Sequence, residues 1–324
     1  MPLSATEAVR PAFACTWRRL AERFRLGFWL RVSVIVMTTG NFFGSCSLDN
    51  FNNYVPSSHD PAFEELRPFL PPGLKLGPLM PYLVIIAVVF IVVAIHWTYA
   101  ASVSHFILFE TVLDGQCELK QAWERWKRQG FRFFLWSLAF FLATLLAFAV
   151  APGAWLAIGL AGFFIGAVAR DFLVPVMALE NRNVLDGWRQ LLAMMREEKM
   201  TYTRYLLMKL LLALVSTLVF GVLTFFVCLI AAIPLAGLGA GIVAIWKAAA
   251  LTWTRVTVSS VEILGMGALA YLLFIASLVS APAAYFFQAY AIYFMAGRYP
   301  LLAGRMESSR SQQSRRRQSA PGAA

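Results

Sequence analysis

Long apolar segments alternate with short basic ones along this chain of 324 residues. A helix needs about 20 apolar residues to cross a hydrocarbon core of about 30 Å. Segments of about this length lie at about 28–45, 80–104, 132–151, 154–178, 204–232 and 263–294. Because the polar backbone groups of a segment in lipid must be satisfied within the protein, each segment is expected to be a helix. The pattern predicts an all-α integral membrane helix bundle with about six transmembrane helices.

The composition supports lipid rather than water as the solvent of these segments. The chain is 60% hydrophobic and 14% charged, whereas soluble chains average about 45–50% apolar and about 25% charged residues. Its four cysteines have neither the spacing of a disulfide framework nor that of a zinc site. No metal is therefore expected.

The basic residues predict the orientation. Segments 1–27, 105–132 and 179–204 hold five Lys or Arg each, and the chain from Arg298 onward holds six. Loops rich in Lys and Arg stay in the cytoplasm. We therefore expect a bacterial inner membrane protein with both termini in the cytoplasm, in which residues 240–258 form an extracytoplasmic interfacial segment. Because topology accounts for the basic residues, no nucleic-acid partner is expected.

Three regions follow from this pattern. Residues 1–27 are predicted to be a cytoplasmic N-terminus with an amphipathic interfacial helix, and residues 28–304 the six-span membrane domain. Residues 305–324 are rich in Ser, Gln and Arg with little to bury, which predicts a disordered tail. A basic tail of this kind is attracted to an anionic leaflet.

Three amphipathic stretches are predicted to lie at the membrane surface. One precedes the first span, and the stretches at about 116–128 and 184–195 lie between two spans, where each would form an elbow helix. Each carries aromatic or apolar side chains on one face and basic side chains on the other, as interfacial helices do. Their expected interfacial anchors are Trp17, Trp123, Trp126 and Trp188.

The two elbow regions look like copies of one unit. Phe106 to Gly115 aligns with Phe172 to Asn181, and each segment is followed by an amphipathic helix with a central tryptophan and then by a span. Both copies run in the same direction through the membrane, so the repeat is parallel. The sequence thus predicts a tandem span–elbow–span repeat.

The chain also resembles a broad group of uncharacterised bacterial polytopic membrane proteins. The likeness lies in Phe28-Trp29-Leu30-Arg31, in residues 106–134 and in Asp171-Phe172-Leu173-Val174-Pro175. The group is similar to the multi-span membrane domain that precedes some glycerophosphodiester phosphodiesterases. The resemblance implies a membrane module without the hydrolase, since a short basic tail stands where the hydrolase would follow. It implies no active-site residue.

Ionisable residues within or near the spans are functional candidates by default. They are His96, Glu110, Asp114, Arg170 and Asp171. Pro175 lies close to Arg170 and Asp171 and interrupts the backbone hydrogen bonds of the helix there. One hypothesis is a polar path that opens into a cytoplasm-facing vestibule. The alternative is a cluster that fixes the bundle.

Small residues mark a candidate packing face. Gly159, Gly162 and Gly166 share one face of the fourth span, and such faces let helices approach closely. Packing within the chain is the favoured interpretation, and a homodimer contact is the alternative.

The sequence contains no nucleophile–base constellation, no phosphate-binding glycine loop and no metal motif. No catalytic residue and no cofactor are therefore expected. The leading hypothesis is a non-catalytic membrane module that organises lipids, anionic ones included, or partner proteins, among them a second copy of the chain. The rival is a transporter or channel for a small solute or lipid. An embedded enzyme would need Glu110, Asp114 and Asp171 close together.

Overall fold

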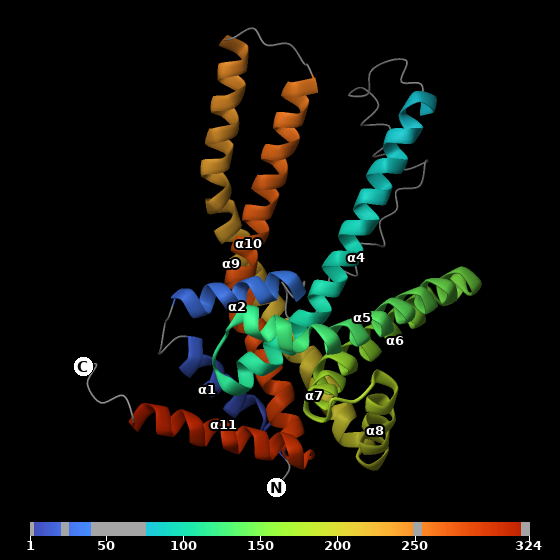
Figure 1. Cartoon of the computed structure of the whole chain (residues 1–324), viewed down its shortest axis with the longest axis vertical. Helices are drawn as coiled ribbons and strands as arrows, with labels where there is room; N and C mark the ends of the chain where they lie inside the picture. Colours follow the sequence, from blue (N-terminus) through green and yellow to red (C-terminus); the bar gives the residue numbers. More distant parts are fainter. Residues whose placement is uncertain (1–2, 21–25, 40–75, 249–254, 319–324) are drawn as a thin grey trace.

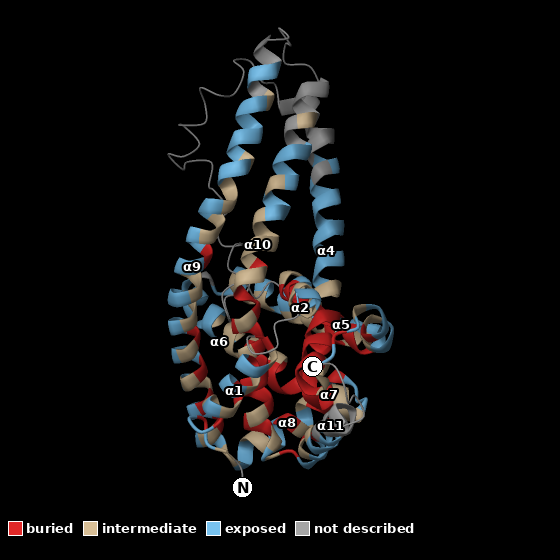
Figure 2. Ribbon diagram, turned by 90° about the vertical axis from the view of Figure 1, so that its left-hand side faces the viewer, coloured by how far each residue is buried: buried red, intermediate tan, exposed pale blue. Residues whose placement is uncertain are grey.

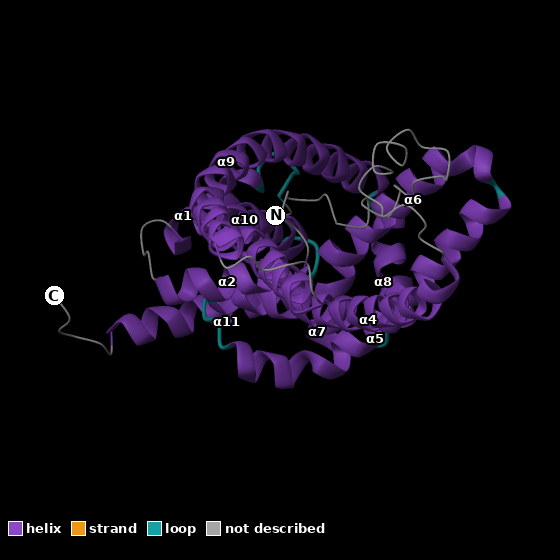
Figure 3. Cartoon of the chain, turned by 90° about the horizontal axis from the view of Figure 1, so that it is seen from above, coloured by secondary structure: helices purple, strands orange, loops and turns teal. Residues whose placement is uncertain are grey.

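The computed structural model describes residues 3–20, 26–39, 76–248 and 255–318. In this part of the chain the regular elements are all helices (Figure 3), which confirms the predicted all-α class. Their order is α1 (Val9–Leu20), α2 (Leu26–Thr39), α4 (Leu76–Asp114), α5 (Leu119–Val150), a short 3₁₀ turn η3 (Pro152–Ala154), α6 (Trp155–Val168), a π-helical turn η4 (Ala169–Leu173), α7 (Val174–Glu180), α8 (Val184–Glu197), α9 (Lys199–Ala248), α10 (Arg255–Ala296) and α11 (Pro300–Gln318).

The helices form three arms that leave a common base (Figure 1). One arm is α4, the second is the α5–α6 hairpin, and the third is the pair α9 and α10, which run side by side. The base contains α1, α2, α7, α8 and α11 together with the near ends of the arms. Figure 2 shows that the buried residues gather in this base.

The core of the base is rich in aromatic side chains. Phe106, Phe172, Tyr205, Tyr290 and Phe294 are all fully buried in one cluster. The far parts of the arms instead expose large apolar side chains, such as Phe90 at 71% and Leu218 at 70%. Surfaces of this size and polarity are costly in water and suit lipid.

Five helical segments of the described chain are long and apolar enough to cross a membrane. They are Ala87–Asp114, Leu119–Val150, Trp155–Glu180, Lys199–Ile242 and Ile263–Ala296. These segments cover the last five of the six predicted spans.

The first predicted span is described only in part. Its described part is α2, an apolar helix of 14 residues, which is about 21 Å long at about 1.5 Å per residue. Residues 40–45 of this prediction lie outside the described residues. Within the base α2 packs against α10 and α4, and the Arg31 guanidinium donates to the carbonyl of Cys117 at 2.7 Å. This hydrogen bond joins α2 to the segment between α4 and α5.

The expected interfacial segment at 240–258 is also described only in part. Residues up to Ala248 continue α9, and α10 begins at Arg255. Residues 249–254 of this prediction lie outside the described residues. The 50 residues of α9 extend about 75 Å, at about 1.5 Å per residue.

The amphipathic stretches form helices in two ways. The stretches near Trp17 and Trp188 lie in the separate helices α1 and α8, whereas the stretch at 116–128 is the first part of the continuous helix α5. Gly130 does not break α5, because it is buried where α5 crosses Val103 of α4.

The predicted disorder of residues 305–324 is wrong for residues 305–318, which belong to α11. Residues 319–324 lie outside the described residues. Leu302 anchors the start of α11 in the core, and Ser309 Oγ donates to Asp114 Oδ1 at 2.9 Å. These tertiary contacts hold a segment whose composition alone predicts no structure.

Candidate functional site

The candidate site is built around the π-helical turn η4, which connects α6 to α7 and carries Arg170 and Asp171. Pro175 follows in the first turn of α7. Because proline has no backbone N–H, one bond of the helical ladder is missing here, and the wider π turn accommodates the change. Single π turns of this kind are often found at functional sites.

Asp171 is the buried acid of the site, with 5% of its surface exposed. Its Oδ2 accepts a hydrogen bond from Tyr205 Oη at 2.9 Å and forms an ion pair with Lys209 Nζ. Lys209 is itself only 8% exposed. A buried charge is tolerated only when it is paired and hydrogen-bonded, and Asp171 has both kinds of partner. The pair fixes α9 against η4.

Stacked aromatic rings surround this pair on the side of the core. The ring of Tyr205 stacks on Tyr290 with centroids 4.9 Å apart and lies 4.4 Å from the ring of Phe294. Tyr290 Oη in turn donates to the carbonyl of Ala5 at 2.9 Å. The contacts therefore run from η4 through α9 and α10 to the segment before α1, and they hold the site in one arrangement.

Two further ionisable residues belong to the site. Arg170 Nε donates to the carbonyl of Gly166 at 3.1 Å. His105 is buried in α4, and both Arg170 and Lys209 act on it electrostatically. The site thus combines the basic side chains of Arg170 and Lys209 with the carboxylate of Asp171.

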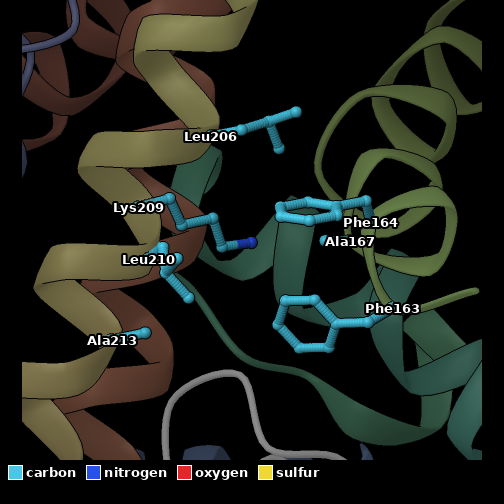
Figure 4. Close-up of a pocket in the computed structure, with 7 residues that line it drawn as sticks. All are labelled: Phe163, Phe164, Ala167, Leu206, Lys209, Leu210 and Ala213. Atoms are coloured by element: carbon cyan, nitrogen blue, oxygen red, sulfur yellow. The ribbon is translucent and has the colours of Figure 1, made fainter. Parts of the chain in front are cut away.

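A small hollow lies beside Lys209 on the side of the arms (Figure 4). Its walls include Phe163, Phe164 and Ala167 from α6 and Leu210 and Ala213 from α9. The Lys209 amine points from α9 toward α6 into this space (Figure 4). The hollow therefore has apolar walls with a cation among them.

The other predicted acids have different partners. Glu110 accepts from Trp126 Nε1 at 2.6 Å and pairs with Arg125, so it joins α4 to α5. Asp114 pairs with Arg305 at 3.4 Å and accepts from Ser309, so it joins α4 to α11. These contacts are of the bundle-fixing kind.

His96 lies apart from these groups, on an exposed face of α4. Its Nδ1 is 2.8 Å from the carbonyl oxygen of Val92 in its own helix. Sequence reasoning missed Tyr205, Lys209 and the buried position of His105. Lys209 could have been found, because it is a single cation at the start of a long apolar run, which meets the criterion that singled out His96.

The predicted tryptophan anchors occupy two kinds of position. Trp17 is 55% exposed beside the equally exposed Phe13, with ring centroids 6.3 Å apart. Trp123, Trp126 and Trp188 are partly buried and pack against the cores.

Two glycines of the predicted packing face, Gly159 and Gly162, lie beside α5 without a close contact to it. Methyl groups at Gly159 and Gly162 would lie 4.0 Å from Phe148 and Thr144 of α5, and one at Gly166 would lie 3.8 Å from Arg170. These are ordinary contact distances. The close approach of two helices occurs instead at Gly130, where a methyl group would lie 2.9 Å from the Cα atom of Val103. Sequence reasoning missed this glycine.

Exposed apolar and basic side chains adjoin one another on three helices of the base. On α1 they are Phe13, Trp17 and Arg18, on α5 Arg128 and Phe131, and on α8 Leu185, Arg189 and Leu192. We call these positions on the three helices, taken together, the interfacial surface.

Comparison with known proteins gives a family and no function. No curated protein and no solved structure matches the chain. Residues 3–304, nearly the whole chain, match a family of unknown function. The chain therefore belongs to the family of unknown function DUF7544.

Proposed function

We propose that the protein is a non-catalytic membrane module that binds anionic phospholipid along the interfacial surface of its base. The observation that carries the proposal is the neighbourhood of exposed apolar and basic side chains on α1, α5 and α8. Apolar side chains enter the boundary between headgroups and acyl chains, while Lys and Arg contact anionic headgroups.

The carboxylates of the base support a structural role for the ionisable groups. Glu110 pairs with Arg125, Asp171 with Lys209, and Glu198 with Arg298 at 2.8 Å. A general acid or base needs a proton-transfer partner in the substrate. Carboxylates held by cations of the same chain are better suited to joining helices.

The rival hypothesis, a transporter or channel for a small solute or lipid, has less support. It requires a polar path from His96 to Arg170 and Asp171, and His96 lies on an exposed face. Between α4, η4 and α10 the fully buried rings of Phe106, Phe172 and Phe294 occupy the interior of the base.

The proposed placement is a bacterial inner membrane with the base on the cytoplasmic side. Lys and Arg are retained on that side, and α1 and α11, the first and last helices described, both belong to the base (Figure 1). The resemblance to the membrane domain of some glycerophosphodiester phosphodiesterases fits a module of this kind, because the hydrolase of those proteins is a separate domain. Partner proteins and self-association are further proposals that the exposed arms allow.

The test compares lipid retention in wild-type protein and in a surface variant. The protein is equilibrated with equal amounts of phosphatidylglycerol and phosphatidylcholine in mild detergent, and the retained lipid is quantified. The surface variant carries Arg18→Gln, Arg128→Gln and Arg189→Gln. Each basic residue near an anionic surface contributes about 1 kcal/mol, so each loss should weaken phosphatidylglycerol retention about fivefold.

The matched control carries Lys247→Gln and Arg255→Gln, at the far ends of α9 and α10. It should retain phosphatidylglycerol as the wild type does. Equal preference for phosphatidylglycerol in the surface variant and in the wild type would refute the proposal.

A further inference from the structure

The arm formed by α4 carries an ionisable side chain on an uncovered surface. Every residue from Ala87 to Thr98 is exposed, and α4 is a single helix, whereas each of the other two arms consists of two helices (Figure 1). From Leu76 to Phe109 the helix has no Asp, Glu, Lys or Arg. Ionisable residues within membrane spans almost always face the interior of a helix bundle or a water-filled cavity. The exposed position of His96 therefore calls for a partner outside this chain.

The imidazole of His96 has one ring nitrogen open. Its Nδ1 is 2.8 Å from the carbonyl oxygen of Val92. Because a carbonyl oxygen can only accept, Nδ1 carries the hydrogen, and Nε2 of the neutral ring is a hydrogen-bond acceptor. Within the described part of the chain, the bond to Val92 is the one that His96 makes. Nε2 thus presents an acceptor on the surface of the arm.

Trp97 presents a donor next to it. Its side chain is 40% exposed, and its indole N–H can only donate. No residue of the described ranges accepts a hydrogen bond from it. Consecutive residues lie about 100° apart around a helix, so the donor and the acceptor share one side of α4 at the same depth. Polar groups without a partner are costly in hydrocarbon.

A second copy of the chain can satisfy both groups at once. Two copies in one membrane have the same orientation, so a twofold axis that relates them runs along the membrane normal and brings the two α4 arms together in parallel. With that axis between the directions of His96 and Trp97, the acceptor of each copy faces the donor of the other copy. A twofold dimer needs a surface that is its own complement, and this pair of neighbours provides one.

Apolar and small side chains extend this face along the arm. Val93 lies three residues before His96 and four before Trp97, and Ala100 lies at the same spacings after them. Residues three and four apart are neighbours on a helix surface, so Val93 and Ala100 lie in line with the polar pair. Val93 is 57% exposed, and the small side chain of Ala100 lets two helices approach closely.

We infer that the α4 arms of two copies of this chain associate in parallel, with His96 Nε2 of each copy accepting a hydrogen bond from Trp97 Nε1 of the other. The inference goes beyond the proposed function, because its partner is a protein and its surface lies on an arm. Lipid binding at the base does not depend on it.

The first measurement maps the face by disulfide formation in liposomes. Single cysteines replace Val93 or Ile91 in full-length protein whose four native cysteines are replaced by alanine. Val93 and Ile91 are 57% and 55% exposed, but they lie about 200° apart around α4. We expect copper phenanthroline to link two copies of Val93→Cys and to leave Ile91→Cys unlinked. His96 and Trp97 stay intact in both variants.

The second measurement obtains the dissociation constant from energy transfer between donor-labelled and acceptor-labelled copies as they are diluted with lipid. His96→Leu removes the acceptor, and Trp97→Phe removes the N–H but keeps an aromatic ring. Each should raise the dissociation constant about tenfold, because both reciprocal hydrogen bonds are lost. Thr98→Val is the matched control, since the Thr98 hydroxyl donates at 2.8 Å to the carbonyl of Ala94 in its own helix. Its dissociation constant should equal that of the wild type.

Three results would overturn the inference. Energy transfer at the level of random collisions in the wild type at every dilution would show that lipid covers this face. Equal linking of Val93→Cys and Ile91→Cys would show that the face is not in contact. An unchanged dissociation constant in His96→Leu and Trp97→Phe would place the association on another surface.

Discussion

The crossing of α4 and α5 at Gly130 gives a prediction whose magnitude follows from the structure. A methyl group added at Gly130 would lie 2.5 Å from Cγ2 and 2.9 Å from Cα of Val103. The second atom belongs to the backbone of α4, so a rotamer change of Val103 cannot relieve the overlap. Gly130→Ala must therefore move the two helices apart.

The cost can be isolated by comparison with Gly162→Ala. A methyl group at Gly162 meets Thr144 at 4.0 Å, an ordinary contact. Both substitutions replace glycine by alanine within a helix, which favours the helix by about 0.8–1 kcal/mol, and this gain cancels in the comparison. Overpacking costs about 1–3 kcal/mol. Gly130→Ala should thus be about 1–3 kcal/mol less stable than Gly162→Ala.

The thiol of Cys117 provides the assay, because it is buried between α4 and α5. In a background with Cys15, Cys46 and Cys228 replaced by alanine, reaction of Cys117 with a fluorogenic thiol reagent reports opening of this region on heating. About 1 kcal/mol shifts the midpoint by about 2–4 °C in domains of 150–250 residues. The midpoint of Gly130→Ala should lie at least about 2 °C below that of Gly162→Ala. Equal midpoints, or a higher one for Gly130→Ala, would refute the described crossing of α4 and α5.

Three further predictions concern the site, a thiol and α11. Lys209→Met should destabilise the protein by about 3–5 kcal/mol, because it leaves the carboxylate of Asp171 buried without its cation. The double variant Asp171→Leu with Lys209→Met should recover most of that loss, because no unpaired carboxylate remains. A double variant less stable than the single one would contradict the pairing. Burial raises the pKa of the Cys117 thiol, so below that pKa Cys117 holds less thiolate than an exposed cysteine would. Maleimide labelling of Cys117 should therefore be slower than labelling of Gln116→Cys in a Cys117→Ser background, and it should accelerate as the pH rises. Equal labelling rates would show Cys117 to be accessible. Asp114→Ala removes the partner of Arg305 and Ser309 and should speed tryptic cleavage within α11. The control Ser308→Ala should leave the cleavage rate unchanged. An unchanged rate in Asp114→Ala would show that Asp114 does not hold α11.

The features that sequence reasoning predicts well are those that depend on neighbours along the chain. The length of an apolar run and the spacing of its polar residues determine whether it can be a lipid-facing helix, so five helices long and apolar enough to cross a membrane and the amphipathic helix α8 are recovered. Asp171 is found for the same reason, since a carboxylate in an apolar segment is conspicuous.

The features that sequence reasoning misses depend on contacts between residues that lie far apart along the chain. Lys209 is 38 positions from Asp171, and nothing local shows that α9 brings the two together. Helix α11 is missed because its order depends on Asp114 of α4. Gly130 is missed because its role depends on Val103 in another helix.

The separation into base and arms follows from what holds helices together in lipid. Lipid tails are as apolar as leucine, so apolar arms gain little by associating with one another, and specific contacts depend on close packing and on polar groups. In this protein the named ion pairs from Glu110, Asp114, Asp171 and Glu198, and the stack of Tyr205 on Tyr290, all lie in the base. The arms are therefore the part whose arrangement lipid can alter, and the hollow at Lys209 lies where an arm leaves the base.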